Sequence, residues 1–598
     1  MNARLSLILL FLSVIPLSAS PLIQNPGGRD VTSLNGTWKI IVDPYETGYF
    51  DYRHQESAWG YGQDAKPKNK QELLEYDFDR SPSLQVPGDW NSQREDLKYY
   101  EGTLWYRKAF EATPKAGKRY FLRFDAANYE AKVWLNGAKL GDHRGGFTPF
   151  EFEVSGILKT GRNSVVVKVD NRRHEEAVPT VNTDWWNYGG LTRDVTLIET
   201  EATFIRDYAV TLGKDAGTVE AWALLDGPAA SGMPVSLKVD GWRAEGRADQ
   251  TGLVRLLMNA DPARWTPEDP RLIDVTLAAG GTSGIHDRIG FRKIETKGVD
   301  ILLNGKPVFL RGICLHEEPI SEKGGRIQNA VQDRELLALA KDLGCNFVRL
   351  AHYPHNEAML READRLGLMV WAEVPVYWTI QWENAATFEN AKSQLEAMIQ
   401  RDKNRASVVI WSVGNETPRG DARLKFMNGL VDAARSLDTT RLISAALEQS
   451  GDLERRVDDP LGHKLDVLGL NEYVGWYDGA PDKCRRVSYS SALEKPLIIS
   501  EFGGDAKQGL HGPKEERWNE EYQAWIYEEQ LPMLDKISNL RGMTPWILKD
   551  FRSPRRPLPG IQDGWNRKGL VSNLGKKKKA FAVLKKYYEA KAKTTPSR

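Results

Sequence analysis

The spacing of hydrophobic and polar residues divides the chain into two halves. From about Leu22 to Thr200, short alternating runs are separated by Gly, Pro and Asn, a pattern typical of strands that bury one face. The dipeptide Asn136-Gly137 separates two such runs and predicts a hairpin turn. Many short strands without long helical periods favour a sandwich, so we expect residues 21–202 to form a jelly-roll β-sandwich.

A second β-rich segment follows at residues 203–296. It contains runs such as PVSLKVDG (234–241), and its length of about 90 residues suits an immunoglobulin-like β-sandwich. The pattern changes within residues 288–312. After this point, strand-like apolar runs alternate with amphipathic helical segments such as 334–344 and 356–367, which predicts a different architecture for the rest of the chain.

Eight strand-like runs stand in the remaining residues, 297–598. They lie at 308–315, 346–352, 369–376, 408–416, 442–447, 466–473, 496–503 and 543–551. Eight strands alternating with helices over roughly 300 residues predict a (β/α)8 TIM barrel. The whole chain is therefore expected to be multidomain, with a jelly-roll sandwich, an immunoglobulin-like sandwich and a TIM barrel. In such barrels the C-terminal ends of the strands carry the chemistry.

Two glutamates satisfy this barrel rule. Glu416 ends the fourth run in WSVGNE, and Glu501 follows the apolar part of the seventh run in IISEFG. A carboxylate at the end of a buried strand is costly unless it faces a polar site. Two carboxylates across a barrel mouth can flank a glycosidic bond, one giving a proton to the leaving oxygen and one attacking the anomeric carbon. We predict Glu416 as the catalytic acid/base and Glu501 as the nucleophile of a β-glycosidase.

Polar and aromatic residues near the strand ends supply candidate sugar contacts. Asn415 precedes Glu416 and can hydrogen-bond the sugar 2-hydroxyl, a contact that strengthens in the transition state. Tyr473 ends the sixth run, after Asn471, and its phenol can hold the nucleophile ionised and oriented. Further candidates for substrate binding are Asp184, His316, Tyr477 and Trp546.

Composition bears on partners and location. The chain has 19 Trp residues, whose faces stack on sugars, and a net charge of +1, which offers no global field to nucleic acid or membrane surfaces. Residues 1–20 combine Arg4, an apolar run and small residues, which predicts a secretory signal and an exported protein, periplasmic or extracellular. No later segment is apolar enough to cross a bilayer. Cys314, Cys345 and Cys484 lack metal-ligand spacing, so we expect structural cysteines, no metal and no cofactor.

Several segments resemble glycoside hydrolase family 2. VPGDWN (86–91), VWLNG (133–137) and LNGKPVFLRG (303–312) are similar to segments of the family's sandwich and of its passage into the barrel. GNE (414–416) resembles its acid/base signature, and SEFG (500–503) resembles its nucleophile segment. The resemblance covers nearly the whole mature chain and implies a retaining mechanism with a covalent glycosyl-enzyme intermediate.

Within the family, three segments resemble the β-glucuronidases. LNEYVGWYDG (470–479) and TDWWNYGG (183–190) are similar to segments that carry active-site Asn, Tyr and Asp residues. WNRKG (565–569) resembles an Asn-x-Lys motif that grips the substrate carboxylate, which implies this role for Asn566 and Lys568. A Lys and an amide donor can bind a uronate through charge-assisted hydrogen bonds. The implied substrate is a terminal β-D-glucuronide of a glycan or a small molecule.

The stretch before the Asn-x-Lys motif departs from the resemblance. Some β-glucuronidases place an Arg shortly before it, whereas GIQDGW (560–565) contains none. We hypothesise that Arg552, Arg555 or Arg556, in a loop a little upstream, takes over that contact. Because glucuronide and galacturonide differ only at C4, β-galacturonidase or β-galactosidase activity stays open as an alternative.

Two further alternatives belong to other classes of protein. A non-catalytic carbohydrate-binding protein with a dead barrel would lack a catalytic carboxylate. Lys576–Lys579 would be the basis of heparin or nucleic-acid binding, although such a run near a helix is more often a solvated face. We expect no nucleic-acid partner and no membrane insertion, and the resemblance implies a homo-oligomer, a dimer or a tetramer. The loops at 374–392 and 505–520 are expected to select the aglycone.

Overall fold

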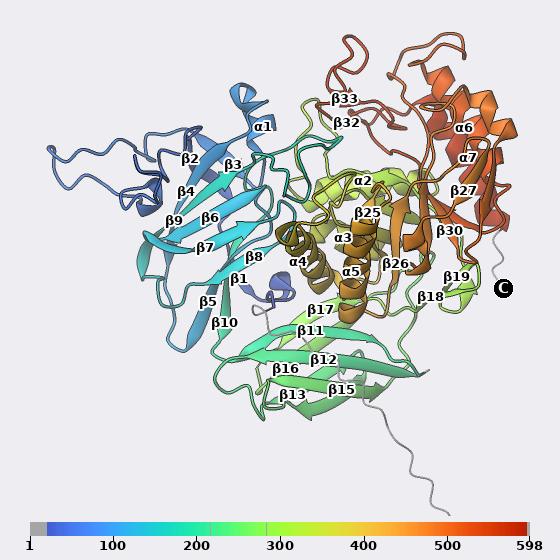
Figure 1. The fold of residues 1–598 in the computed structure, drawn as a ribbon. Helices are drawn as coiled ribbons and strands as arrows, with labels where there is room; N and C mark the ends of the chain where they lie inside the picture. Colours follow the sequence, from blue (N-terminus) through green and yellow to red (C-terminus); the bar gives the residue numbers. More distant parts are fainter. Residues whose placement is uncertain (1–20, 216, 283, 595–598) are drawn as a thin grey trace, which may run out of the picture.

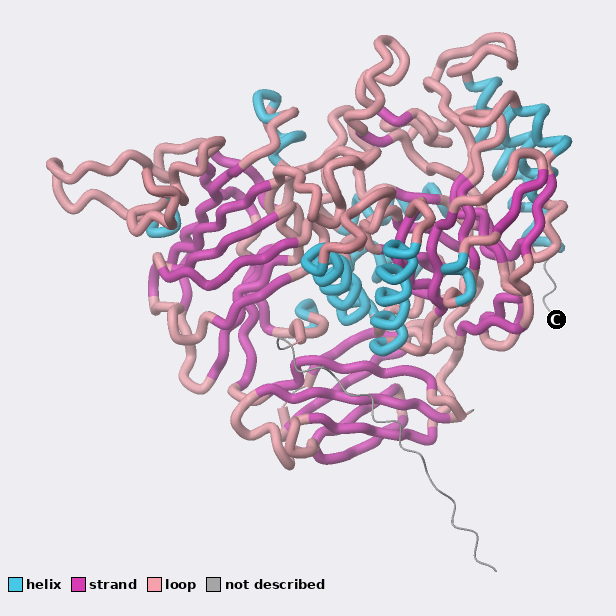
Figure 2. The backbone as a smooth tube through the Cα atoms, viewed as in Figure 1, coloured by secondary structure: helices cyan, strands magenta, loops and turns pink. Residues whose placement is uncertain are grey.

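The computed structural model describes residues 21–215, 217–282 and 284–594. These residues fold into three consecutive bodies, two β-sandwiches and a barrel. Figure 1 shows a first sandwich in blue, a second in green below it, and a barrel that takes up the yellow-to-red half of the chain. Figure 2 shows that the long helices gather around the barrel, while the other two bodies consist almost entirely of strands and loops. The expected signal segment, residues 1–20, lies outside the described ranges. Within those ranges, no helix has both the length and the apolar character needed to span a bilayer.

The first body is a β-sandwich of two antiparallel sheets. Six strands pair in the order β3-β2-β4-β9-β6-β7 and four in the order β1-β10-β5-β8. Their apolar faces meet in a core that includes Trp38, Leu122 and Val167. Asn136 and Gly137 join β6 to β7 with φ values of 52° and 83°, the left-handed conformation of a two-residue hairpin turn, which confirms the predicted hairpin. The elements are β1 (Asp30–Ser33), β2 (Gly36–Val42), β3 (Ser83–Val86), α1 (Trp90–Gln93), β4 (Thr103–Ala112), β5 (Lys118–Phe124), β6 (Glu130–Leu135), β7 (Ala138–Arg144), β8 (Phe150–Glu153), β9 (Gly161–Asp170) and β10 (Val195–Glu201).

The second body is a smaller sandwich with sheet orders β11-β12-β15 and β14-β13-β16-β17. In β15, Val254, Leu256 and Met258 are buried and the residues that follow each of them are exposed, as a strand with one buried face requires. Seven strands in two packed sheets agree with the predicted immunoglobulin-like architecture. The strands are β11 (Phe204–Leu212), β12 (Thr218–Asp226), β13 (Pro234–Val239), β14 (Trp242–Arg247), β15 (Leu253–Asn259), β16 (Ile273–Ala279) and β17 (Ile285–Ile289).

The barrel closes through a first strand that is broken in two. β21 and β22 are separated by Gly312 and Ile313, and the parallel order runs β21-β31-β30-β28-β26-β25-β24-β23-β22. The two halves pair with β31 and β23, the eighth and second strands. This closes a ring of eight strands and confirms the predicted TIM barrel. The strands are β21 (Leu310–Arg311), β22 (Cys314–Leu315), β23 (Phe347–Leu350), β24 (Met369–Glu373), β25 (Val408–Asn415), β26 (Leu442–Leu447), β28 (Leu468–Asn471), β30 (Leu497–Glu501) and β31 (Leu540–Met543).

The predicted position of the eighth strand, 543–551, is wrong. β31 ends at Met543, where the prediction began. The apolar residues that follow leave the ladder, and Trp546 and Phe551 pack into a buried aromatic cluster at the C-terminal end of the barrel. A buried loop and a buried strand are both apolar, so the hydrophobic run alone did not distinguish them.

Helices between the strands surround the barrel, and those predicted at 334–344 and 356–367 correspond to α2 and α3. Four helices begin at an Asn whose side chain accepts a backbone N–H of the first turn, a cap worth about 1 kcal/mol: Asn329, Asn356, Asn384 and Asn519. The helices are α2 (Ala330–Asp342), α3 (Glu357–Leu366), α4 (Ala385–Asp402), α5 (Asp421–Leu437), α6 (Glu520–Leu534) and α7 (Lys579–Thr594). Two small sheets lie in the connections, β27 (Glu454–Val457) with β29 (Ser488–Ser491) and β32 (Phe551–Arg552) with β33 (Trp565–Asn566).

A third small sheet covers the N-terminal end of the barrel. Its strands are β18 (Ile294–Lys297), β19 (Asp300–Leu303) and β20 (Lys306–Pro307). Ile301 and Leu303 pack there with Trp265 and with the barrel residues Trp371 and Ile498. Because this end is filled by apolar side chains, the C-terminal end is the one open to a substrate.

Buried ion pairs hold both sandwiches on the barrel. Arg193 of the first sandwich donates to Glu317 of the barrel at 2.9 Å, and both side chains are 3% exposed. Arg405, after α4, donates to Asp287 of the second sandwich at 2.5 Å. Removal of one partner from such a pair leaves an uncompensated buried charge. The first sandwich is therefore fixed beside the barrel, as Figure 1 shows.

Candidate active site

Glu416 and Glu501 lie at the open end of the barrel and are connected by Asn471. Glu416 follows β25 directly, and Glu501 is the last residue of β30. Asn471 ends β28, and its side-chain N–H donates to Glu416 Oε1 at 2.9 Å. The backbone of Asn471 also lies opposite Glu501 in the ladder between β28 and β30. The structure thus brings the two predicted catalytic carboxylates to one place.

Tyr377 lies close to both carboxylates and to Asp184. Burial raises the pKa of the Tyr377 hydroxyl well above its usual value, and the charges of Asp184, Glu416 and Glu501 raise it further, while Arg556 lowers it. Charges shift a pKa in this way at short range. Asp184 belongs to the first sandwich, so the site is built from two of the three bodies.

Glu501 is buried and held by two donors. Arg349 Nη1 donates to Glu501 Oε1 at 2.8 Å, and the Tyr473 hydroxyl donates to Oε2 at 2.7 Å. Burial raises the pKa of Glu501, Arg349 opposes the rise, Glu416 adds to it and Tyr473 lowers it. Both donors favour the ionised carboxylate, which is the form that a nucleophile needs.

Glu416 is positioned by its backbone and by a neighbouring indole. Its φ of 47° lies in the left-handed region, a conformation that is uncommon for a residue other than glycine and that occurs at functional sites at a cost of about 1–3 kcal/mol. Trp378 Nε1 donates to Glu416 Oε2 at 2.8 Å. The side chain of Glu416 is half-buried, so it keeps the access that a proton donor requires.

Behind Glu501 lies a buried network that the sequence prediction missed. Arg349 donates to the two oxygens of Glu373 at 2.9 and 3.1 Å, and His352 Nδ1 lies 2.8 Å from the same carboxylate. Burial would raise the pKa of Glu373, but Arg349 and His352 lower it to about 2. Glu373 is therefore a lasting anion that fixes Arg349 against Glu501. Glu373 ends β24, so the rule that selected the two catalytic glutamates was able to select it too.

Asn415 presents an unpaired amide donor. Its Oδ1 accepts from Arg349 Nη2 at 2.7 Å and from Asn471 Nδ2 at 3.2 Å. These two donors fix the orientation of the amide. Its Nδ2 has no partner among the described residues, although the side chain is 2% exposed. A buried donor without a partner is unfavourable, so this N–H is ready to bind a substrate acceptor such as the sugar 2-hydroxyl.

A second polar group surrounds Asp184. β32 pairs with β33, so the intervening loop, which carries Arg556, returns beside Asn566. Arg556 donates to Asp184 Oδ1 at 3.1 Å and forms an ion pair with Oδ2, and Asn566 Nδ2 donates to Oδ2 at 3.3 Å. Of the three arginines considered as a carboxylate contact, Arg556 lies in this group. Arg552 instead stacks on Trp565 at 4.1 Å from its ring centre.

Lys568 is buried and paired next to this group. Its Nζ lies 2.6 Å from Asp505 Oδ2 and 2.9 Å from the Tyr477 hydroxyl. Arg556 also reaches the Tyr477 hydroxyl, at 3.3 Å, so both cations meet at one phenol. Burial would lower the pKa of Lys568, but Asp505 raises it above its usual value, and Lys568 stays charged. Asp505 stands in a loop without periodicity, which gave the sequence analysis no signal for it.

His316 and Trp546 belong to the aromatic floor of the site. Each is 4% exposed, and Trp546 stacks on His352 with ring centres 4.8 Å apart. His316 Nδ1 lies 3.1 Å from the Tyr353 hydroxyl, and its Nε2 has no partner in the part of the chain that the structure describes. Burial lowers the pKa of His316 well below its usual value, so the ring is neutral. Its free nitrogen is the feature that suits a sugar hydroxyl.

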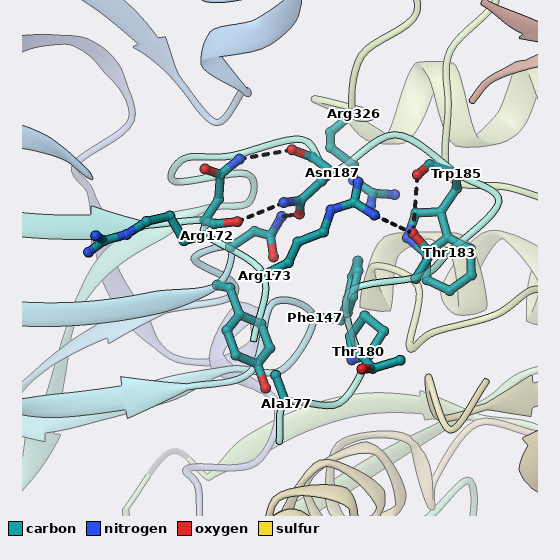
Figure 3. Close-up of a pocket in the computed structure, with 13 residues that line it drawn as sticks. Phe147, Arg172, Arg173, Ala177, Thr180, Thr183, Trp185, Asn187 and Arg326 are labelled. Carbon is teal, nitrogen blue, oxygen red and sulfur yellow. Dashed lines mark hydrogen bonds between the residues drawn. The ribbon is translucent and has the colours of Figure 1, made fainter. Parts of the chain in front are cut away.

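A small cavity lies behind the loop that carries Asp184. Its volume of about 20 Å³ is enough for one water. Figure 3 shows Arg173 directed at Thr183, to which it donates at 3.2 Å, and Asn187, which donates to the backbone of Asn171 at 2.6 Å. These bonds hold the loop that carries Asp184 against the residues that follow β9.

One cysteine lies beside the site, since Arg349 Nη1 is 3.9 Å from the Sγ of Cys314. Cys314, Cys345 and Cys484 are buried and unbridged. In residues 21–215, 217–282 and 284–594, no three His, Cys, Asp or Glu side chains are grouped so as to hold a metal ion.

The site combines two carboxylates at the open end of a TIM barrel, amide and indole donors around them, and an Asp from a sandwich. This combination defines a glycoside hydrolase. The description "Glycosyl hydrolases family 2, TIM barrel domain" matches residues 294–592, and "Glycosyl hydrolases family 2, sugar binding domain" matches residues 31–201. The chain belongs to glycoside hydrolase family 2, as the sequence resemblance implied.

Similar proteins carry one activity in their names. The chain is 27% identical to a beta-glucuronidase of Paenibacillus borealis, over 93% of this chain and 96% of the relative, and 28% identical to that of Sus scrofa, over 94% and 91%. A Formosa agariphila protein is 29% identical over 85% of this chain, and the match spans 66% of that relative's length. The solved structure of Bifidobacterium dentium beta-glucuronidase complexed with coumarin-3-O-glucuronide has a TM-score of 0.82 and 26% identity, covering 96% of this chain and 98% of that one.

Proposed function

We propose that the protein is a retaining exo-β-glycosidase that hydrolyses terminal β-D-glucuronides through a covalent glycosyl-enzyme intermediate. The observation that carries the proposal is the pair Glu416 and Glu501 at the open end of the barrel, connected through Asn471. The beta-glucuronidases of P. borealis and S. scrofa, similar over more than nine-tenths of the chain, support the choice of sugar.

In the first step Glu501 attacks the anomeric carbon while Glu416 gives its proton to the leaving oxygen. The bond from this carbon to the aglycone breaks as the bond to a Glu501 oxygen forms, and Glu416 becomes an anion. Arg349 and Tyr473 hold Glu501 in place before the attack. Trp378 and Asn471 donate to Glu416 and stabilise the anion that the proton transfer leaves.

In the second step a water attacks the same carbon and releases the sugar. Glu416 takes a proton from this water, the bond to Glu501 breaks, and both carboxyls return to their starting states. The free amide N–H of Asn415 is proposed to bind the 2-hydroxyl oxygen in both transition states. Retention of configuration follows from two successive displacements at one carbon.

The substrate carboxylate is proposed to bind among Asn566, Lys568 and Arg556. In the free site Lys568 pairs with Asp505, and Arg556 pairs with Asp184. A uronate can share both cations through charge-assisted hydrogen bonds, for which the planar guanidinium is well suited. Asp184 then loses part of its contact with Arg556 and can accept a hydrogen bond from a sugar hydroxyl.

β-Galacturonidase activity is the second candidate, because the same carboxylate contacts serve either epimer at C4. A neutral galactoside is disfavoured, since the buried Lys568 and the half-buried Arg556 would face an uncharged C6 group. A non-catalytic role is disfavoured because both carboxylates are present with hydrogen-bond donors.

The test is a set of aryl β-glucuronide, galacturonide and galactoside substrates, assayed at one pH. Lys568→Ala is expected to lower kcat/KM for the uronides by about 10- to 150-fold, the effect of about 1.5–3 kcal/mol for a hydrogen bond to a charged group. It should hardly change the rate on the galactoside. Lys238→Ala, at an exposed position of β13, is the control. Equal losses on charged and neutral substrates would contradict the carboxylate grip.

Replacement of either carboxylate tests the catalytic roles directly. Glu416→Ala and Glu501→Ala should each abolish turnover of an aryl β-glucuronide while circular dichroism shows an intact fold. A near-normal rate in either variant would refute its assignment.

We also propose that the protein is exported, to the periplasm or the medium, and forms a dimer or tetramer. The composition of residues 1–20 supports export, and the family resemblance supports the oligomer. N-terminal sequencing of the secreted chain and light scattering test these points. A retained residue 1 or a monomeric mass would contradict them.

A further inference from the structure

Two successive arginines of the loop between β32 and β33 contact different parts of the site. Arg556 pairs with Asp184, beside the residues proposed to bind the uronate. Arg555 donates instead to Asn182 Oδ1, two residues earlier in the sandwich loop, and its guanidinium lies 4.9 Å over the ring of Trp378. The loop therefore presents one cation to the carboxylate end of the site and one to the Trp378 side.

The Trp378 side is where the aglycone leaves. Trp378 Nε1 donates to Glu416 Oε2 at 2.8 Å, and Glu416 is the group proposed to protonate the leaving oxygen. The aglycone begins at that oxygen, so it must pass the indole as it enters and departs. A cation on the indole ring lies beside this path.

Arg555 differs from its neighbours in having no anion. Arg556 and Lys568 each have a carboxylate within ion-pair distance, whereas Arg555 has none among the described residues. It is exposed and held by a neutral amide and an aromatic face. Such a guanidinium is positioned but not neutralised, and it retains N–H donors for an anion.

Resting on the proposed function, we infer that Arg555 and Trp378 form an aglycone subsite that selects an anionic group, a sulfate ester or a carboxylate, on the residue next to the cleaved bond. The indole offers a stacking face for a sugar or aryl ring, and the guanidinium offers a fork of donors for the anion. The substrate is then a glucuronide attached to an acidic partner.

The test compares 4-nitrophenyl β-glucuronide with two analogues whose aryl ring carries a carboxylate or a sulfate. For each substrate, the ratio of kcat/KM between the Arg555→Ala variant and the wild type removes differences in leaving-group reactivity. We expect a loss of about fivefold for both charged analogues, the effect of about 1 kcal/mol, and less than twofold for the neutral substrate. Arg555→Lys should keep part of the preference, and added salt should weaken it in the wild type.

Arg243→Ala, an exposed change in β14 of the second sandwich, serves as the control and should alter none of the ratios. Equal changes on neutral and charged substrates, or no change on either, would overturn the subsite. A loss on one analogue alone would support the subsite and identify the anion that it binds. A wild type without activity on any of the three glucuronides would overturn the proposed function, and this inference with it.

Discussion

The phenol of Tyr473 tests how the site activates its nucleophile. Tyr473→Phe removes the hydroxyl that donates to Glu501 Oε2 at 2.7 Å and keeps the ring. A hydrogen bond to a charged group contributes about 1.5–3 kcal/mol, which corresponds to a loss of about 10- to 150-fold in kcat/KM. The direction on pH follows as well. The Tyr473 hydroxyl lowers the pKa of Glu501, so its removal raises that pKa. As the pH is lowered, the variant should therefore lose activity at a higher pH than the wild type, which shifts the acidic limb of its pH profile upward.

The assay is a profile of kcat/KM against pH for an aryl β-glucuronide. Tyr587→Phe is the matched control. Tyr587 lies on α7, away from the site, and its hydroxyl also donates to a carboxylate, that of Asp535, at 2.6 Å. The control should leave both the rate and the acidic limb unchanged. An acidic limb at the wild-type position in Tyr473→Phe, or a limb shifted to lower pH, would refute the role of the phenol.

Two further changes probe the groups around the carboxylates. Glu373→Gln leaves Arg349 with Glu501 as its remaining carboxylate partner, and the side chains of Arg349 and Glu373 are both 0% exposed. The free energy of unfolding should therefore fall, by at most about 3–5 kcal/mol, and kcat should fall with it. Denaturant unfolding checks this, and an unchanged midpoint and rate would contradict the network. Trp378→Phe removes the donor to Glu416, which should slow substrates with poor leaving groups more than activated aryl glucuronides, because protonation matters more for the former. Equal slowing of both would exclude a role in proton transfer.

The sequence predicted the architecture because each of the three bodies has its own pattern of apolar and polar residues. Alternation in segments such as β15 follows from one buried face, and strands that alternate with helices lead to a barrel. The eighth strand was misplaced because Trp546 and Phe551 are buried without belonging to the parallel ladder of the barrel. Apolar patterning reports burial, and hydrogen-bond pairing has to come from the structure.

The candidate site was predictable where strand ends or a family motif identified it. Glu416, Glu501 and Asn471 stand at strand ends, and the structure places them together. Arg349 lies inside a strand and contacts Glu501 from below the rim, which no strand-end rule selects. The choice of Arg556 over its neighbour depends on how a loop folds back onto Asp184, a tertiary contact without a periodic signal.

Covalent labelling of the nucleophile tests the central claim most directly. A 2-deoxy-2-fluoro-β-glucuronyl fluoride should inactivate the protein with one label per chain. Its 2-fluorine slows both steps, while the fluoride leaving group keeps formation of the intermediate faster than its hydrolysis. Peptide mass spectrometry should place the label on Glu501. A label on Glu416 or Glu373, or an unlabelled protein that releases the product as the α-anomer, would contradict the account.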